Sequence, residues 1–406
     1  MQKSGGAAIL MQANFDNLRF VVGNEKTIEE MAYARPLKPF SDEVINFLAA
    51  LSKKLMDVGK EYPDVATFGF WCRRSALLKE KEKYDDLTSR LGKGIVFHST
   101  PSNVPVNFAF SFAAGLLAGN TNIVRLPAKD FEQVEIICKC INGLLEKEFS
   151  SLSNYICFVR YPSDQKITDF MSSICDVRVI WGGDRTISEI RKSDLKPRAT
   201  EITFSDRYSI AVINADEYLK IENKKKVSND FYNDTFYSDQ NACTSPRIII
   251  WLGKEKTKAQ EIFWRNIHDL VKEKYKLSPV QVVGKLTALF KVAAEHNVKL
   301  AQQDDQLITR VQIDNLFENL MNYKYNSGFF FEYNAKSLEE ILPLCSIKCQ
   351  TLTYIGINFA EIKEFIFKYG PHGIDRAVPM GSSMDFTLVW DGYDLIRSLS
   401  RKFNVI

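Results

Sequence analysis

The sequence feature that most constrains the fold is the alternation of short apolar segments with helix-forming segments between residues 94 and 214. The apolar segments are GIVFHS, NIVRLP, YICFVRY, VRVIWGG and YSIAVIN. The stretches between them, NFAFSFAAGLLAG, FEQVEIICKCINGLLEKEF, DQKITDFMSSIC and DRTISEIRKSD, have helical periodicity. Strands that alternate with helices in this way indicate βαβ units and a parallel sheet. Strands so continuously apolar fit a sheet covered on both faces.

A second alternating region follows the basic, polar stretch KIENKKKV at residues 220–227, which we interpret as a hinge. Its apolar segments are PRIIIWLG, LITRVQI, GFFFEYN and QTLTYIGIN, and KAQEIFWRNIHDLVKEKY has helical periodicity. A chain of 406 residues is too long for one ordinary hydrophobic core, and its length suits two or three domains. We therefore predict an α/β protein with domains at 1–218 and 219–375, followed by a C-terminal segment at 376–406.

The first ninety residues have a mixed pattern. Alternation at Leu18–Val22 predicts a strand, and periodicity predicts helices at 41–59 and 73–91. The serine and two acids at residues 41–43 are typical of a helix start.

Charge and hydropathy exclude several classes of protein. The 53 basic and 50 acidic residues give a net charge of +3, which offers no broad electrostatic case for nucleic acid or an anionic membrane. Residues 99–124 carry no charge, but prolines, glycines and polar residues interrupt the run, so we predict no membrane span. The first residues lack the apolar core of a signal peptide, and we expect a cytoplasmic protein.

The eight cysteines are scattered and mostly flanked by apolar residues. In a cytoplasmic chain of this size they indicate reduced thiols rather than a disulfide framework. Cys138 lies close to Cys140, and Cys345 close to Cys349, but neither pair has a second pair of ligands at the usual spacing. We therefore predict no metal site.

Cys243 differs from the other cysteines because it lies just before an apolar segment, in DQNACTSP at residues 239–246. Its small polar neighbours leave room for partial exposure. A thiolate is a strong nucleophile and a good leaving group, so this position suits acyl transfer through a thioester. The alternative is a small buried cysteine, which is the commoner state of an unpaired thiol.

Two loops of the first region could bind ligands. Asn103, in PSNVP, follows an apolar strand at the edge where open α/β sheets place ligands, and its amide could stabilise an oxyanion or simply form a turn. Gly182 and Gly183 precede a helix, an arrangement that admits a phosphate but also occurs in ordinary turns. The chain has no GxGxxG fingerprint.

Three charged residues are weaker candidates. Glu201 could act as a general base beside a thiol if it were partly buried, although an isolated glutamate is usually solvated. Arg125 and Lys129, in NIVRLPAKD, could hold a ribose or a 2′-phosphate, or they could be ordinary surface charges.

The order PSNVP, GNTNIVRLPAKD, WGG, Glu201 and NACTSPRI resembles that of the aldehyde dehydrogenase superfamily. The stretch GIDRAVPMGSSMDFTLVWDGYDLIRSLSR resembles the LuxC-type acyl-CoA reductases, the fatty acid reductases of bacterial luminescence and their relatives. The resemblance covers residues 90–406. It implies an aldehyde dehydrogenase-like fold, with a Rossmann-like cofactor-binding domain, an α/β catalytic domain and a C-terminal segment for crossing or oligomerisation.

The resemblance also implies residue roles. Cys243 occupies the nucleophile position, Asn103 the oxyanion position and Glu201 the general-base position, although EITFSD lacks the glycines that normally follow that glutamate. The positions that match cofactor-binding residues are Pro101, Ser102, Arg125, Lys129, Gly182 and Gly183. Arg125 replaces the usual lysine, and the family expectation is NADPH.

The implied reaction is NADPH-dependent reduction of a fatty acyl-CoA or acyl-protein thioester to the aldehyde through an acyl-cysteine. The rival interpretations are a dehydrogenase that runs in the oxidative direction and a catalytically silent scaffold with the same fold. The resemblance further implies an acyl-protein synthetase as partner and a homo-oligomer.

Overall fold

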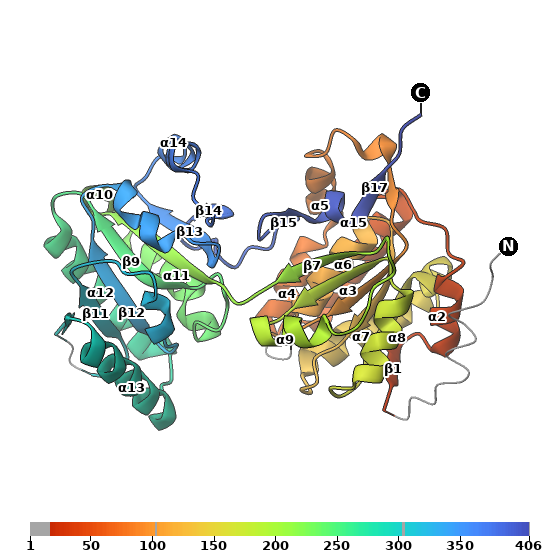
Figure 1. Cartoon of the computed structure of the whole chain (residues 1–406), viewed down its shortest axis with the longest axis horizontal. Coiled ribbons are helices and arrows are strands. Elements are labelled where there is room, and N and C mark those ends of the chain that lie inside the picture. The colour runs from red at the N-terminus through yellow and green to blue at the C-terminus, as the bar shows by residue number, and fades with distance from the viewer. Residues whose placement is uncertain (1–16, 102–103, 303–304, 406) are drawn as a thin grey trace. The chain divides into compact units, whose positions relative to one another are not determined.

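A computed structural model describes residues 17–101, 104–302 and 305–405. The chain forms two compact units (Figure 1). The first unit extends to Ser205 and includes the C-terminal stretch from Leu388, whereas the second comprises Asp206–Thr387.

The first unit is built on a six-stranded sheet with the order β1-β5-β4-β3-β6-β7. Its strands are β1 (Arg19–Val22), β3 (Ile95–Ser99), β4 (Thr121–Arg125), β5 (Ile156–Arg160), β6 (Val177–Trp181) and β7 (Thr200–Phe204). All neighbours are parallel except β1, which runs antiparallel to β5. The predicted parallel sheet is therefore confirmed.

Helices cover both faces of this sheet because the strand residues alternate between two apolar cores. The helices are α2 (Glu25–Met31), α3 (Asp42–Val58), α4 (Pro63–Trp71), α5 (Arg74–Lys81), α6 (Asn107–Leu117), α7 (Glu132–Leu145), α8 (Gln165–Ile174) and α9 (Asp184–Ile190). Met171 of α8 shares a core with Cys157 of β5. The next residue of β5, Phe158, contacts Phe112 of α6 edge to face.

The second unit is built on a seven-stranded sheet with the order β10-β11-β12-β9-β8-β13-β14. Its strands are β8 (Tyr208–Asn214), β9 (Pro246–Leu252), β10 (Val298–Leu300), β11 (Thr309–Ile313), β12 (Phe329–Asn334), β13 (Cys349–Ile355) and β14 (Arg376–Pro379). Only the pairing of β10 with β11 is antiparallel among these described neighbours. The strand β9 is central.

Both faces of the second sheet are also covered. The helices of this unit are α10 (Ala215–Lys220), α11 (Lys224–Asp234), α12 (Lys256–Lys274), α13 (Pro279–Glu295) and α14 (Phe359–Tyr369). Along β9, Ile248 and Ile250 share one core with Val292 of α13. Ile249 and Trp251 belong to the opposite core, which includes side chains of α11 and α12.

The boundary between the units differs from the boundary that we predicted at residue 218. Segment YSIAVIN forms β8, which pairs with β9 and β13 and therefore belongs to the second sheet. The basic stretch 220–227 is not a hinge, because it lies within the second unit and spans the end of α10 and the start of α11. Apolar periodicity identified the strand but could not assign it to a sheet.

The C-terminal segment is divided between the units. The strand β14 forms an edge of the second sheet, and the residues from Leu388 onward belong to the first unit. Their elements are β15 (Val389–Trp390), β16 (Tyr393–Asp394), α15 (Leu395–Leu399) and β17 (Ser400–Lys402). The last strand pairs antiparallel with β2 (Arg90–Gly92) of the first unit.

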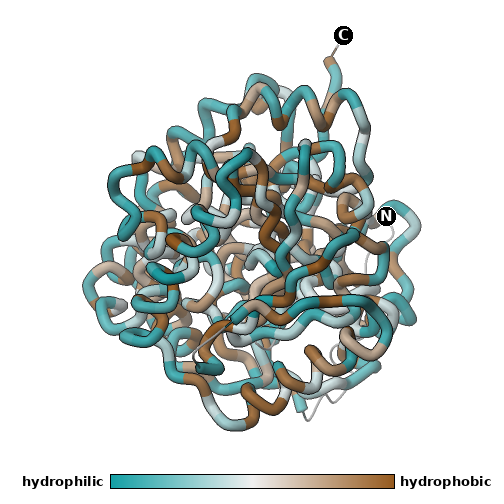
Figure 2. Tube along the Cα trace, turned by 90° about the vertical axis from the view of Figure 1, so that its left-hand side faces the viewer, coloured by the Kyte–Doolittle hydropathy of each residue, from teal (hydrophilic) through white to brown (hydrophobic). Residues whose placement is uncertain are grey.

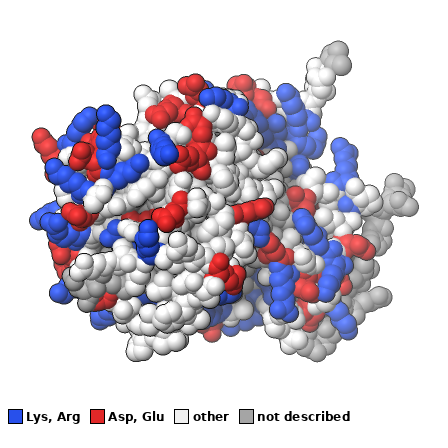
Figure 3. All heavy atoms as spheres, turned by 60° about the vertical axis from the view of Figure 1, so that its left-hand side comes forward, with Lys and Arg blue, Asp and Glu red and all other residues white. Residues whose placement is uncertain are grey.

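Polarity follows this layering. In Figure 2 hydrophobic stretches run through the interior, while hydrophilic residues are frequent on the outer turns. Figure 3 shows acidic and basic side chains interspersed on the displayed face, as the small net charge leads us to expect. Within the described part of the chain, every helix is too short or too polar to cross a bilayer.

A buried carboxylate joins several elements of the second unit. Glu332 of β12 accepts hydrogen bonds from the indole N–H groups of Trp251 at 3.0 Å and Trp264 at 2.5 Å. Arg310 of β11 forms an ion pair with the other oxygen at 2.8 Å. Glu332 is only 2% exposed, so these donors replace the water that the carboxylate loses on folding.

We expect Glu332→Ala to lower the free energy of unfolding by about 3–5 kcal/mol, because it leaves a partly buried guanidinium and two indole donors without their acceptor. Tryptophan fluorescence during urea unfolding measures the change, since two tryptophans adjoin the site. The control Glu364→Ala, at an exposed position of α14, should alter stability by less than about 0.5 kcal/mol. Equal effects of the two substitutions would contradict the assigned role of Glu332.

Candidate active site

Cys243 lies at the amino end of the central strand of the second sheet. It is half-buried, in the loop between the 3-10 helix η3 (Phe236–Ser238) and β9. None of the eight cysteines, all of which lie in described residues, is part of a disulfide. Burial raises the pKa of the seven other thiols, and this disfavours their reactive thiolate form.

The chain reverses direction just before Cys243. Asp239 and Gln240 have left-handed backbone angles, with φ of 49° and 52°. Two positive-φ residues in succession cost backbone energy, so the surrounding contacts must hold this conformation. Ser327 donates a hydrogen bond to the Asp239 carboxylate at 3.2 Å, and Gln281 donates another at 2.9 Å.

Gln240 ties the loop to the sheet. Its side chain is fully buried, donates to the carbonyl of Pro246 at 3.2 Å and accepts from the N–H of Gly328 at 2.8 Å. On the other side, the hydroxyl of Ser209 donates to the carbonyl of Cys243 at 2.7 Å. Strands β8, β9 and β12 thus hold the cysteine at their common amino edge.

A buried cation lies beside this loop. Arg247 is 7% exposed and donates to the carbonyls of Gln240 and of Tyr325, the latter at 2.9 Å. Burial lowers the pKa of Arg247 to about 10, and the negative charges of Asp206, Asp239 and the Cys243 thiolate oppose that effect. Because attraction between two charges favours both charged forms, the guanidinium stabilises a thiolate at Cys243.

The first unit gathers its predicted ligand-binding residues at the carboxyl edge of its sheet. Ser99 pairs with Arg125 on one side and with Ile180 on the other, so the loops that follow these three strands leave the sheet together. The hydroxyl of Thr100 donates to the carbonyl of Arg125 at 2.6 Å. Pro101 is half-buried, whereas Ser102 and Asn103 lie outside the described residues.

The two predicted cations at this edge differ in their surroundings. The guanidinium of Arg125 lies 4.4 Å from the ring centre of Tyr161 and donates to the carbonyl of Pro162 at 3.2 Å. Lys129 is exposed. Arg125 is thus oriented by the protein, while Lys129 is accessible to a ligand.

The glycine pair leaves the backbone accessible. The N–H of Gly182 donates to the carbonyl of Phe204 at 3.1 Å, which continues the ladder between β6 and β7. A Cβ atom at Gly183 would meet no atom within 4 Å, so the backbone there faces open space. This fits the approach of a bulky ligand to the turn.

A hydrogen-bonded network of buried polar side chains lies behind this edge, and the sequence patterns did not predict it. Trp181 donates its indole N–H to the hydroxyl of Ser111 at 2.9 Å, and that oxygen lies 2.7 Å from Nδ1 of His98. Nε2 of His98 lies 3.0 Å from Oδ1 of Asn122. Burial lowers the pKa of His98 to about 4, so the ring is neutral and joins β3, α6, β6 and β4. The position of His98 inside an apolar strand is the sequence feature that could have indicated this network.

Glu201 does not join the other predicted residues. It lies near the amino end of β7, in register with Arg178, whereas Phe204 at the carboxyl end pairs with Trp181. Its Oε2 accepts from Arg178 at 2.6 Å and its Oε1 from Arg191 at 2.7 Å. Both carboxylate oxygens are engaged by cations, which favours a structural role over that of a general base.

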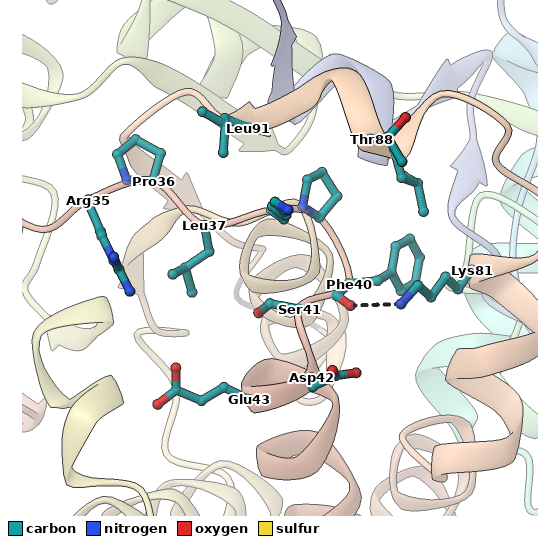
Figure 4. A pocket seen from close by; sticks show the side chains of 13 residues that line it. Arg35, Pro36, Leu37, Phe40, Ser41, Asp42, Glu43, Lys81, Thr88 and Leu91 are labelled. Carbon is teal, nitrogen blue, oxygen red and sulfur yellow. Dashed lines mark hydrogen bonds between the residues drawn. The ribbon is translucent and has the colours of Figure 1, made fainter.

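A cavity of about 620 Å³ lies away from the predicted residues. Residues 35–43 line much of it, and Figure 4 shows Lys81 directed toward the carbonyl of Phe40. The backbone of Leu37 forms hydrogen bonds with the backbones of Gly92 and Gly119. These glycines precede β3 and β4, so the cavity adjoins the amino edge of the first sheet. Within the described residues no cluster of His, Cys, Asp or Glu has the composition of a metal site.

Comparison of the sequence with protein families identifies a family that matches much of the chain. The family described as acyl-CoA reductase (LuxC) matches residues 73–311, more than half of the chain. Long-chain acyl-protein thioester reductase of Vibrio harveyi is 25% identical over 317 residues, which are 76% of this chain and 63% of that protein. The aligned part therefore spans less than two thirds of that relative.

Solved structures with a similar fold include aldehyde dehydrogenases. The salicylaldehyde dehydrogenase of Pseudomonas putida G7 has a TM-score of 0.64 at 13% identity, covering 93% of this chain and 87% of that one. An NAD-dependent benzaldehyde dehydrogenase of Corynebacterium glutamicum has a TM-score of 0.57 at 12% identity, covering 93% and 82%. These likenesses confirm the predicted fold class.

We expect Glu201→Ala to destabilise the first unit by about 3–5 kcal/mol, because Arg178 is 2% exposed and would lose its carboxylate partner. The rate at which iodoacetamide alkylates Cys243 should not change. Thermal unfolding and intact-mass spectrometry measure the two quantities. Glu189→Ala, which removes an exposed partner of Lys192, is the control and should affect neither. Slower alkylation with unchanged stability would instead support a general base.

Proposed function

The chain belongs to the LuxC acyl-CoA reductase family, and from this premise we propose that it reduces an acyl thioester to an aldehyde through an acyl-cysteine intermediate. The observation that carries the proposal is the setting of Cys243. Its thiol is half-buried at the amino end of β9, on a loop held by Gln240 and Ser209 and beside the buried cation of Arg247. This combines access for a substrate with stabilisation of the reactive thiolate.

In the first step, the Cys243 thiolate attacks the carbonyl carbon of the substrate thioester. A new bond forms between the cysteine sulfur and the acyl carbon, and the bond to the original sulfur breaks. The leaving group departs as a thiolate and takes up a proton from solvent. The positive charge of Arg247 attracts the thiolate form of Cys243.

The acyl-cysteine must next gain a hydride, which a bound nicotinamide cofactor supplies. The residues proposed to hold that cofactor are Pro101, Ser102, Arg125, Lys129, Gly182 and Gly183. The open backbone at Gly183 and the cations at the same sheet edge fit a dinucleotide. We propose NADPH because exposed Lys129 and oriented Arg125 suit a 2′-phosphate.

Hydride addition places a negative charge on the former carbonyl oxygen. In this proposal the amide of Asn103 and the backbone N–H of Cys243 donate hydrogen bonds to that oxygen. Collapse of the adduct breaks the carbon–sulfur bond, releases the aldehyde and restores the Cys243 thiolate. None of these reaction steps activates a water molecule. The proposed mechanism therefore needs no general base for water, and Glu201 has no role in it.

The two rival functions are less well supported. Oxidation of an aldehyde to a carboxylic acid needs an activated water, and the carboxylate of Glu201 is paired with Arg178 and Arg191 instead. A silent scaffold has no need for a half-buried cysteine on a loop with two positive-φ residues.

The acyl donor and the partners are also proposals. The name of the Vibrio harveyi relative, a long-chain acyl-protein thioester reductase, supports a long acyl group carried on a protein. An acyl-protein synthetase would then supply the substrate. We further propose that the chain forms a homo-oligomer, as the family resemblance implies.

We expect incubation with a long-chain acyl-CoA to add one acyl group to the protein, as measured by intact-mass spectrometry, and Cys243→Ala to abolish the adduct. With NADPH present, the unmodified protein should release the aldehyde. Cys140→Ala is the control, since that cysteine is half-buried in the first unit and should be dispensable. An adduct that persists in Cys243→Ala would refute the assignment of the nucleophile.

We expect Lys129→Ala to weaken NADPH binding about fivefold and to leave NADH binding unchanged, because the exposed ammonium would contact only the 2′-phosphate. Fluorescence titration of the protein with each cofactor gives both dissociation constants. The control Lys139→Ala removes an exposed lysine from α7 and should change neither. If Lys129→Ala weakened the binding of NADPH and NADH equally, Lys129 would not contact the 2′-phosphate.

A further inference from the structure

A short segment after β14 lies beside the residue that follows the nucleophile. We call Met380–Asp385 the exit segment, since it leads out of the second sheet. The sulfur of Met384 lies 3.3 Å from the hydroxyl oxygen of Thr244, the neighbour of Cys243 in sequence. Thr244 is only 3% exposed, whereas Met384 is 39% exposed. The exit segment therefore presents an accessible apolar side chain next to the nucleophile loop.

A buried carboxylate holds the N–H groups of the exit segment. Asp234 is the last residue of α11 and is fully buried. Its two oxygens accept hydrogen bonds from the backbone N–H groups of Gly381 at 2.7 Å and Ser383 at 3.0 Å. Burial raises the pKa of Asp234 to about 6, so the group is charged at neutral pH and both oxygens are acceptors.

A guanidinium holds the carbonyl groups of the same segment. Arg376 of β14 donates to the carbonyls of Ser383 at 2.7 Å, Ser382 at 2.9 Å and Asp385 at 2.6 Å. A planar guanidinium offers several donors in a fixed geometry, so three carbonyls bound to it have little freedom to move. Asp234 and Arg376 thus bind opposite polar groups of one short stretch of backbone.

Glycine at position 381 is part of this arrangement. It has a φ of +95°, and a Cβ atom there would lie 2.7 Å from the Cβ of Asp230. The backbone can therefore approach α11 closely enough to reach Asp234 only without a side chain. The N–H of Met380 also donates to the carbonyl of Tyr354, at 3.1 Å, which anchors the start of the segment to β13.

We propose that the exit segment forms a wall of the acyl site, that Met384 contacts the acyl chain on Cys243, and that Asp234 and Arg376 are positioning residues for this wall. The proposal rests on the proposed function. A rigid backbone with one flexible thioether at its surface suits contact with an alkyl chain of variable conformation. Met384 then selects for acyl groups long enough to reach it, and it contributes nothing to an acetyl group.

The test compares the rates of adduct formation on Cys243 with acetyl-CoA and decanoyl-CoA, without cofactor, by intact-mass spectrometry. Met384→Ala should lower the ratio of the decanoyl rate to the acetyl rate about tenfold, the size expected for lost methylene contacts. Met384→Leu restores apolar contact and should keep the ratio within about twofold of the unmodified protein. The partial exposure of Met384 makes both substitutions compatible with folding.

The positioning role of Asp234 is tested with Asp234→Asn, whose amide nitrogen cannot accept one of the two N–H hydrogen bonds. We expect the decanoyl-to-acetyl ratio to fall as in Met384→Ala, while iodoacetamide alkylation of Cys243 stays unchanged. Glu222→Gln removes an exposed acid just before α11 and should leave the ratio unchanged. A damaged fold would expose the buried cysteines and add further alkyl groups to the protein, so the two measurements separate positioning from misfolding.

The outcomes distinguish this inference from the proposed function. If neither acyl-CoA labels the unmodified protein, the proposed function fails. If both label it and Met384→Ala leaves the ratio unchanged, the wall assigned to the exit segment is wrong. If Met384→Ala lowers the ratio and Asp234→Asn does not, Asp234 is not a positioning residue.

Discussion

The buried hydrogen bonds of Gln240 are the contacts on which the candidate site depends. They bind a loop with two left-handed residues to the strands on either side of it, and they do so where water cannot compete. Without them, the preferred backbone conformation would straighten the approach to β9 and move Cys243 from the sheet edge. The position of the thiol is thus determined by polar groups that take no part in the chemistry.

The two sheets use opposite edges for their candidate residues. In the first sheet, the loops after β3, β4 and β6 leave the carboxyl edge together, where parallel α/β sheets commonly bind ligands. In the second sheet, Cys243 precedes β9 and Ser209 lies near the start of β8, so the nucleophile belongs to the amino edge. This division fits the proposed reaction, in which one unit holds the cofactor and the other the acyl group.

Three acidic groups that are buried or partly buried are each held by several partners. Glu332 has two indoles and a guanidinium, Glu201 has two arginines, and Asp234 has two backbone N–H groups. A charge removed from water is tolerated only when its lone pairs are satisfied in this way. The three residues look alike in sequence, because each is a single acid near an apolar stretch. Only their hydrogen-bond and ion-pair partners separate the structural roles of Glu332 and Glu201 from the positioning role proposed for Asp234.

The sequence by itself determined the α/β class, most strands of both regions, the helices between the strands of the first region, and the Cys243 loop as the feature that needed a chemical explanation. Those conclusions rest on local periodicity and on residue types, which neighbours in sequence reveal. Only the tertiary structure decided that β8 belongs to the second sheet, that Glu201 is paired with Arg178 and Arg191, and that Met384 lies beside Thr244. These facts depend on strand order and on contacts between residues far apart in the chain, and no local pattern encodes them.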